Sequence, residues 1–271
     1  MAGRAIHGVT REDIDNIIDF IKDVVKDTGC KGLVVGASGG VDSAVTTKLC
    51  ADAIGAENVL NIFMPSAVTP PEDYIQTRDL SRMWGTEYKV IDVQPAVNTF
   101  TGMFSPTAET PLEKGNISTR CRMVIMYNRA KKLDYLVVGT MNRSEYMMGY
   151  FTKFGEGASD LFPIVDLYKT QVWQAAEMIG VPREIIEKVP TAGLWEGQTD
   201  EGEMGIAYND LDIVLNGITT GQSDDEIAKD VKAGAAKVSE IRGRVKGMGH
   251  KRNAPYRPDI AFNDTGIRKL Y

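Results

Sequence analysis

Apolar residues recur along this chain with two different spacings, and together they predict a repeated strand–helix order. Short apolar runs rich in β-branched residues, typical of buried strands, occupy residues 33–35, 59–64, 88–93 and 135–139. Between them, apolar residues at helical spacing predict helices over residues 43–54, 71–84 and 117–133. An earlier helix can be capped by Thr10 and is stopped by Gly29. This alternation favours an α/β fold with a mostly parallel sheet and helices on both faces.

The pattern changes after Gly149. Residues 151–159 and 191–205 carry several glycines and lack a regular apolar spacing, so we predict two long loops there. Loops of that length in a compact domain usually serve a function. Helical spacing returns at residues 170–179, 206–215 and 224–245. Since no internal repeat or linker interrupts the chain, we expect one domain over residues 1–271.

Three segments directly follow predicted strands, at residues 37–43, 64–68 and 140–145. Ligands bind at the carboxyl ends of strands in open parallel sheets. In the first segment, a Gly-Gly turn flanked by Ser38, Asp42 and Ser43 leads into a predicted helix. Unpaired backbone N–H groups and the helix dipole favour a phosphate at such a position. The spacing excludes both the G-x-x-x-x-G-K-[ST] loop and the G-x-G-x-x-G loop.

Composition narrows the class of protein. The net charge of −6, from 31 basic and 37 acidic residues, argues against nucleic acid or an anionic membrane as the main partner. The three cysteines are widely spaced, form no metal-ligand pattern and suggest a reducing compartment. No apolar run approaches about 18 residues, and the N-terminus lacks a signal pattern. We therefore expect a soluble, cytoplasmic protein.

The pattern Ser-Gly-Gly-x-Asp-Ser at residues 38–43 resembles the pyrophosphate loop of the ATP pyrophosphatases, which cleave ATP to AMP and pyrophosphate. That cleavage needs Mg²⁺, which takes oxygen ligands. Asp42 on the loop and Glu145 after the fourth strand would supply carboxylates at neighbouring strand ends. The alternative interpretations are a plain glycine turn and a solvated helix glutamate.

Further motifs follow in the order typical of the ammonia-dependent NAD synthetases, which convert nicotinic acid adenine dinucleotide (deamido-NAD) to NAD. The chain is similar to this family over residues 10–258. The matching segments are residues 38–44, 115–116 with Arg120 and Arg122, 139–145, 149–163, 169–171, 190–192, 198–201 and 250–252. The resemblance implies a doubly wound, Rossmann-like sheet of the adenine nucleotide alpha hydrolase type.

The resemblance also implies roles for individual residues. The positions matching ATP contacts are Gly36, Ala37, Ser38, Gly39, Gly40, Val41, Asp42, Ser43, Thr140, Lys169 and Thr191. Those matching deamido-NAD contacts are Arg120, Lys153, Asp160, His250 and Lys251. Asp42 and Glu145 match the Mg²⁺ ligands, and Glu156 falls near the ammonia site. The implied catalytic set is Asp42, Glu145, Glu156 and Lys169. Without the resemblance, each of these residues reads as an ordinary surface charge, cap or core residue.

The implied chemistry suits these residue types. A carboxylate is a poor acceptor for ammonia, so it first attacks the α-phosphorus of ATP and forms an acyl-adenylate with release of pyrophosphate. Mg²⁺, Lys169 and the loop amides neutralise the phosphate charge. Glu156 can hold ammonium and help to remove its proton. The two glycine-rich loops would exclude water from the adenylate.

Alternatives and departures accompany this hypothesis. One alternative is a tRNA-modifying adenylating enzyme of the same loop class, which would need an RNA-binding surface and often cysteine pairs. The net negative charge and the lack of a Cys-x-x-Cys motif argue against it. A non-enzymatic nucleotide sensor is disfavoured by the three carboxylates Asp42, Glu145 and Glu156.

The resemblance implies a homodimer, to which the helix at residues 117–133 can contribute, and no glutaminase part is evident. Phe63 stands where some members carry an arginine that helps to hold adenine, and residues 256–271 match poorly.

Overall fold

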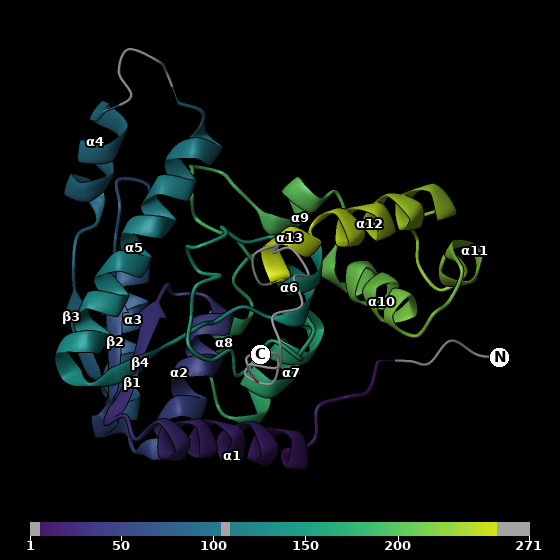
Figure 1. Cartoon of the computed structure of the whole chain (residues 1–271). Helices are drawn as coiled ribbons and strands as arrows, with labels where there is room; N and C mark the ends of the chain where they lie inside the picture. The colour runs from purple at the N-terminus through teal and green to yellow at the C-terminus, as the bar shows by residue number, and fades with distance from the viewer. Residues whose placement is uncertain (1–5, 104–108, 254–271) are drawn as a thin grey trace, which may run out of the picture.

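The order of the strands creates a single reversal point in the sheet. The structure, a computed structural model, describes residues 6–103 and 109–253. Within that part of the chain, four strands form one parallel sheet in the order β3-β2-β1-β4 (Figure 1). They are β1 (Gly32–Ala37), β2 (Val59–Phe63), β3 (Glu87–Val90) and β4 (Tyr135–Val138). Because β2 and β4 pair with opposite sides of β1, the order reverses between β1 and β4. Ligands bind at such reversal points.

Successive residues of β1 pack on opposite faces of the sheet. Leu33 and Val35 join a core with α1 (Arg11–Thr28), α2 (Val41–Ile54) and α7 (Lys169–Met178). Val34 joins the core of the other face, with α5 (Pro111–Leu133). Burial on both faces explains the continuous apolar run of this strand. The remaining helices around the sheet are α3 (Pro71–Trp84), α4 (Gln94–Met103) and α8 (Arg183–Ile186), with a short 3-10 turn η1 (Ala56–Asn58) before β2.

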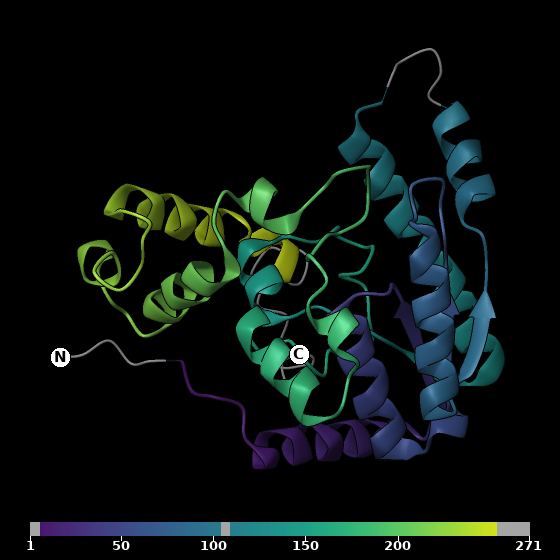
Figure 2. The same ribbon diagram turned by 180° about the vertical axis from the view of Figure 1, so that it is seen from behind.

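A second group of helices packs beside the sheet (Figure 2). Its centre is α10 (Tyr208–Thr219), in which Tyr208, Leu211 and Leu215 are fully buried. Trp173 on α7 packs against both this core and the core of the sheet, so α7 joins the two groups. The other members are α6 (Arg143–Met148), α9 (Asp200–Met204), α11 (Asp224–Ile227), α12 (Ala235–Gly247) and α13 (Gly249–Arg252).

The predicted α/β fold is confirmed, and the four predicted strands coincide with the observed ones to within three residues at each end. The helix after Thr10 is confirmed as well. Thr10 accepts a hydrogen bond from the backbone N–H of Asp13 and completes a capping box, and Gly29 ends the helix in the left-handed conformation with φ of 68°. The predicted span of α3 agrees at both ends. In the described part of the chain, no helix is long and apolar enough to cross a membrane.

Two sequence predictions of secondary structure were wrong, and the helix α4 was not predicted. The helix expected over residues 224–245 is two helices, α11 and α12, because the chain turns back between them and brings Ile227 and Val238 into one core. The loop expected at 191–205 contains α9, which Thr199 caps. The helix α4 was missed because Val97 is its one buried residue, which leaves little apolar periodicity to detect. Residues 256–271, which match the family poorly, lie outside the described residues.

Candidate functional site

The carboxyl ends of β1, β2 and β4 open into one cavity of about 490 Å³. It lies at the reversal point between β1 and β4, as expected for a ligand site in a parallel sheet. All three segments singled out after predicted strands contribute to its wall, together with the two long loops. The contributing residues include Gly36, Ala37, Ser38, Asp42, Met64, Val68, Thr140, Glu145, Glu156, Lys169, Thr191 and Asp200.

The turn after β1 is held by its own hydroxyl groups. The Oγ atoms of Ser38 and Ser43 lie 3.0 Å apart, and Ser43 Oγ donates to the carbonyl of Gly40 at 2.9 Å. Gly39 adopts φ of 80°, a conformation that a side chain would strain. Gly40 is the N-cap of α2 and offers no side chain to the helix end. The first N–H groups of α2 are therefore left for an anion in the cavity.

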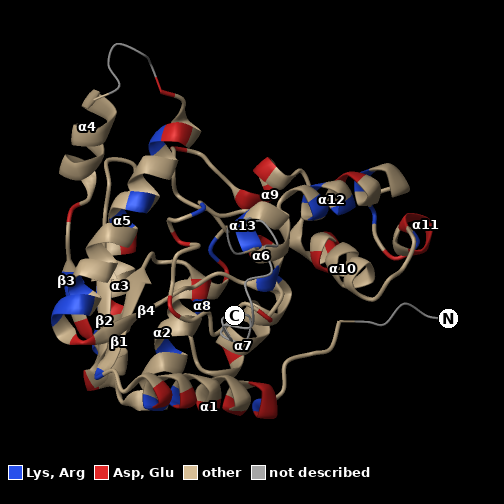
Figure 3. Ribbon diagram, viewed as in Figure 1, with Lys and Arg blue, Asp and Glu red and all other residues tan. Residues whose placement is uncertain are grey.

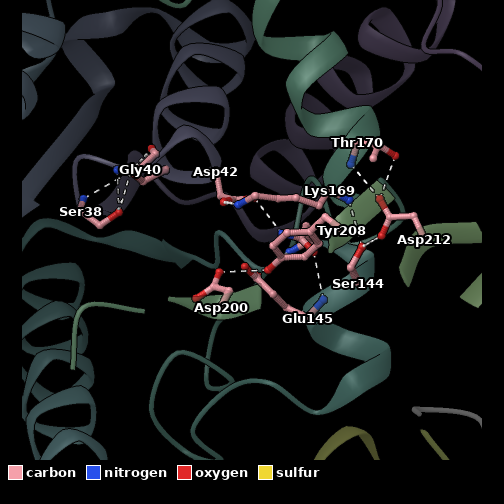
Figure 4. Close-up of polar contacts among 12 residues, drawn as sticks. Ser38, Gly40, Asp42, Ser144, Glu145, Lys169, Thr170, Asp200, Tyr208 and Asp212 are labelled. Carbon is pink, nitrogen blue, oxygen red and sulfur yellow. Dashed lines mark hydrogen bonds and ion pairs between the residues drawn. The ribbon is translucent and has the colours of Figure 1, made fainter. Parts of the chain in front are cut away.

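Asp42 and Lys169 form an ion pair at the centre of the site (Figure 4). Asp42 Oδ2 accepts from the ammonium of Lys169, and Asp42 Oδ1 accepts from Asn142 Nδ2 at 2.9 Å. The Lys169 side chain is only 3% exposed, although it stands on the first turn of α7. The two residues are 127 positions apart in the chain, and the packing of α7 against α2 brings them together.

Glu145 reaches the same place through a helix cap. Asn142 Oδ1 accepts from the backbone N–H of Glu145 at 3.0 Å, and Glu145 Oε2 accepts from the backbone N–H of Asn142 at 3.2 Å. This reciprocal capping box fixes the carboxylate beside Asp42 and Lys169. Desolvation and the charge of Asp42 hold the pKa of Glu145 well above its ordinary value, and Lys169 opposes that shift. The structure thus brings together both predicted metal ligands.

Asp200 is a third carboxylate of the site, and the sequence analysis did not assign it a role. Its side chain is 3% exposed, and Oδ2 accepts from the hydroxyl of Tyr208 at 3.0 Å. The other oxygen, Oδ1, is buried without a hydrogen-bond partner. Burial raises the pKa of Asp200, while the charge of Lys169 lowers it. The matching segment 198–201 contained this residue, but nothing in the segment distinguished it from Glu201.

Asp212 holds the backbone on either side of the site, and it was also missed. Its Oδ1 accepts from Ser144 Oγ at 2.5 Å, and its Oδ2 accepts from the N–H and hydroxyl of Thr170 at 2.9 and 2.8 Å. Ser144 Oγ in turn accepts from the backbone N–H of Lys169 at 3.0 Å. Asp212 is fully buried, and burial raises its pKa despite these donors. Asp212 stands between apolar residues of α10, and this charged residue within an apolar run was the sequence signal that could have identified it.

The donor set suits a hard divalent cation. Asp42 and Glu145 present carboxylate oxygens, which Mg²⁺ prefers, and the partnerless oxygen of Asp200 adds negative charge nearby. Within residues 6–103 and 109–253, no group of three His, Cys, Asp or Glu residues is close enough together to hold a metal ion. The ammonium of Lys169 supplies the positive charge between the carboxylates instead.

Four of the five residues that the resemblance assigns to deamido-NAD are linked by hydrogen bonds around residues 149–163. Arg120 Nε donates to the carbonyl of Lys153 at 3.3 Å, and Lys153 Nζ donates to the carbonyl of His250 at 2.7 Å. Lys251 Nζ donates to the carbonyls of Gly149 and Phe151 at 2.7 and 2.6 Å. Lys251 also lines a second cavity of about 530 Å³, with aromatic and basic residues that include Tyr146, Phe151 and Arg252.

Asp160, the fifth of these residues, instead contacts β4 and α5. Its Oδ2 accepts from the backbone N–H of Val137 at 2.7 Å, and its Oδ1 accepts from the hydroxyl of Tyr127 at 3.3 Å. Burial, together with the charge of Asp160, raises the pKa of Tyr127 to about 12. In this structure the carboxylate of Asp160 therefore fixes the end of the 149–163 loop to the edge of the sheet.

Glu156 lies on the wall of the first cavity, within reach of a small ligand. Its Oε1 accepts from the backbone N–H of Thr152 at 2.9 Å. Desolvation by the cavity wall raises the pKa of Glu156, and the charges of Arg122 and Lys251 oppose that shift. Arg122 is itself held by the carbonyl of Met64, to which its Nε donates at 3.1 Å. The side chain is still exposed to the cavity, as binding a cation from solvent requires.

A family model described as NAD synthase matches residues 13–255 of the chain. A protein from Archaeoglobus fulgidus named NH(3)-dependent NAD(+) synthetase is 44% identical, over 89% of this chain and 94% of the relative. A protein of the same name from Pyrococcus horikoshii is 43% identical, over 92% of this chain and 96% of the relative.

Two solved structures are similar along almost their whole length. NMN synthetase from Francisella tularensis is 32% identical with a TM-score of 0.82, over 92% of this chain and 98% of that one. The NH3-dependent NAD synthetase from Campylobacter jejuni, in complex with the nitrate ion, is 26% identical with a TM-score of 0.78 and the same coverage.

Proposed function

We infer the function of this chain from one premise: the chain belongs to the NAD synthase family. Its activity is the ATP-dependent amidation of deamido-NAD to NAD with ammonia, which releases AMP and pyrophosphate. One observation carries the proposal beyond family membership. The open N-terminus of α2, the ion pair of Asp42 with Lys169, and Glu145 all meet in a single cavity at the reversal point of the sheet.

ATP occupies the cavity with its phosphates at the turn after β1. Backbone N–H groups of residues 38–43 and the hydroxyls of Ser38 and Ser43 bind the phosphate oxygens. Thr140, Lys169 and Thr191 complete the ATP contacts from the surrounding wall. Phe63, Val68 and Met126 make part of the wall apolar, which suits a base that is packed and not held by an arginine.

Asp42 and Glu145 would hold a Mg²⁺ ion that accompanies ATP. Their carboxylate oxygens are the ligand type that this ion takes. Asp200 Oδ1, which has no hydrogen-bond partner, belongs to a residue on the wall of the same cavity. When bound, Mg²⁺ neutralises the charge that develops on the phosphates as pyrophosphate leaves. Lys169 contributes a second positive charge from the start of α7.

The reaction proceeds in two displacements. In the first, an oxygen of the nicotinate carboxylate forms a bond to the α-phosphorus, and the bond from that phosphorus to the pyrophosphate oxygen breaks. In the second, the nitrogen of ammonia bonds to the acyl carbon, the bond from that carbon to the AMP oxygen breaks, and a proton is lost. Glu156 attracts ammonium into the cavity and accepts the proton.

Deamido-NAD binds along the 149–163 loop. Hydrogen bonds link Arg120, Lys153, His250 and Lys251 around this loop. Arg244 of α12 and Arg252 of α13 donate to backbone carbonyls of α6, and the ribbons of α12 and α13 carry several basic residues (Figure 3). A dinucleotide with two phosphates suits such a basic surface. Asp160 belongs to the same binding site at the far end of the loop. A homodimer is part of the proposal, with α5, which exposes Leu112 and Val124, as the helix that would contribute to the interface.

A second substrate is favoured by one specific observation. The protein named NMN synthetase shares 32% identity and a TM-score of 0.82 with this chain. An enzyme that makes NMN by the same chemistry would act on the mononucleotide, which lacks the adenylate half of deamido-NAD. We rank this candidate second because relatives with more than 40% identity carry the NAD synthetase name.

The test compares the two substrates directly. Purified protein is incubated with ATP, Mg²⁺ and ammonium, and with either deamido-NAD or nicotinate mononucleotide, while NAD, NMN, AMP and pyrophosphate are quantified by chromatography. We expect NAD and AMP in equal amounts, and a kcat/KM at least about tenfold higher for the dinucleotide. AMP without NAD would refute the proposal, and a preference for the mononucleotide would favour the second candidate.

A further inference from the structure

Lys169 bonds to the proposed metal ligand and not to a position where phosphate would lie. Its ammonium donates to Asp42 Oδ2, next to the Glu145 carboxylate and above the ring of Tyr208, whose centroid is 5.4 Å away (Figure 4). The positive charge of an ammonium in contact with a carboxylate oxygen repels a divalent cation from that carboxylate. Lys169, placed as it is here, therefore competes with Mg²⁺ for Asp42.

The charges around Lys169 require a cation at this position. Asp42, Glu145 and Asp200 all interact electrostatically with the ammonium, and Lys169 is 3% exposed. The Asp42 side chain in this ion pair is 16% exposed, so both charged groups are largely removed from water. A carboxylate group left without a nearby cation in such a place is strongly unfavourable. A divalent cation can therefore replace the Lys169 ammonium beside Asp42, but the ammonium cannot leave without such a replacement.

The geometry allows this exchange with movement of a single side chain. The backbone of Lys169 is fixed, because its N–H donates to Ser144 Oγ and Asp212 anchors both Ser144 and Thr170. The lysine stem has four rotatable carbons, so the ammonium can leave Asp42 while α7 stays in place. The N-terminus of α2, where the triphosphate binds, begins one residue before Asp42.

We propose that the Lys169 ammonium is an internal counter-ion that fills the divalent-cation position in the nucleotide-free protein and moves to the phosphates of ATP when nucleotide and metal enter together. This inference rests on the proposed function for the identity of the nucleotide. It has a consequence of its own: Asp42 and Glu145 bind a divalent cation weakly without nucleotide, and metal and ATP each raise the affinity for the other. Such coupling is reciprocal by thermodynamic necessity.

Manganese binding to the nucleotide-free protein tests the exchange. Free Mn²⁺ is measured by electron paramagnetic resonance with the wild type, Lys169→Met and Lys188→Met. Lys188 is a matched control, because it lines the same cavity and is ion-paired, but its partner is Asp73 and not Asp42. We expect Lys169→Met to bind Mn²⁺ at least about tenfold more tightly than the wild type, and Lys188→Met to behave like the wild type. Adding Asp42→Asn to Lys169→Met should abolish the gain.

Two results would overturn the inference. One is tight Mn²⁺ binding by the nucleotide-free wild type, equal to that of Lys169→Met. The other is a gain in Lys169→Met that survives Asp42→Asn. Should Lys169→Met fail to fold, the wild type alone decides the question, because a non-hydrolysable ATP analogue must then raise its Mn²⁺ affinity at least about tenfold.

The metal readout is independent of turnover. If the protein makes no NAD but shows the predicted Mn²⁺ binding pattern, the proposed function is refuted and the cation exchange is supported. If it makes NAD but binds Mn²⁺ tightly without nucleotide, the proposed function is supported and the cation exchange is refuted. Thermal stability gives a second signal, since Mn²⁺ without nucleotide should raise the melting temperature of Lys169→Met and leave that of the wild type unchanged.

Discussion

At the scale of single residues, Asp42 has a donor on each carboxylate oxygen, Asn142 on one and Lys169 on the other. The bond from Asn142 keeps Asp42 oriented toward the site when Lys169 leaves, so this part of the site is preorganised. The sequence analysis expected Asp42 on the loop after the first strand; the structure places it second in α2, because the helix begins two residues earlier than predicted. The partners of Asp42 come from residues 100 and 127 positions away, and no local pattern predicts them.

Replacing Asp42 with asparagine removes one charge and keeps the size of the side chain. We expect Asp42→Asn to reduce pyrophosphate release by about a hundredfold or more, because the metal loses a ligand and Lys169 loses its ion-pair partner. A coupled pyrophosphate assay measures the effect. The matched control is Asp52→Asn on the same helix, whose carboxylate pairs with Lys48 away from the cavity. Equal losses in both variants would remove Asp42 from the metal site.

Glu156 permits a test of the ammonia step alone. We expect Glu156→Gln to raise the KM for ammonium by about tenfold, because the neutral amide no longer attracts the cation. The first displacement, followed as exchange of labelled pyrophosphate into ATP, should be nearly unchanged. Glu156→Asp retains the charge and should recover part of the ammonium affinity. An identical ammonium dependence in the wild type and Glu156→Gln would exclude this role.

At the scale of elements, a helix cap and one buried carboxylate orient α6 and α7 toward the site. Asn142 caps α6 and sets the direction of Glu145, and Asp212 on α10 bonds to Ser144 and Thr170. The cap involves residues only three positions apart, so the position of Glu145 in the first turn of α6 could be predicted from the local sequence. The contact of α10 with α6 and α7 is tertiary, so periodicity alone gave Asp212 no role.

The pH dependence of stability tests the burial of Asp212. Burial raises the folded-state pKa of Asp212 above its unfolded value of about 3.9. The native state therefore holds a proton that the unfolded state has lost. The stabilising contribution is complete below the unfolded pKa and is lost as pH rises through the folded pKa.

We expect Asp212→Asn to destabilise the protein by about 1–3 kcal/mol at about pH 4.5, because donors from Ser144 and Thr170 lose an acceptor. The deficit in melting temperature should shrink by about pH 8. Differential scanning calorimetry of both proteins at the two pH values measures it. Asp225→Asn, on the exposed side of α11, is the control and should leave the melting temperature unchanged at both. A deficit that grows with pH would contradict the raised pKa.

At the scale of the whole molecule, the strands of the sheet could be predicted, but the packing of the second group of helices could not. The strands are continuous apolar runs bounded by turns, and both signals are local. The position of the cavity at the carboxyl ends of the strands follows from a rule for parallel sheets. The order β3-β2-β1-β4 was not predicted, because it depends on which distant strands pair. Likewise, the break between α11 and α12 and the burial of Asp200 depend on how α10 packs, which requires contacts between distant segments.

The pairing of β1 with β4 also bears on when the site can exist during folding. The turn after β1, α2 and β2 are contiguous in the chain and can form early, but Asn142, Glu145 and Lys169 join Asp42 only after a loop of about a hundred residues has closed. Closing such a loop carries an entropic cost that local contacts do not share. Recovery of nucleotide binding during refolding would therefore mark the last long-range step, not the first collapse, and an arrested intermediate would have secondary structure without affinity.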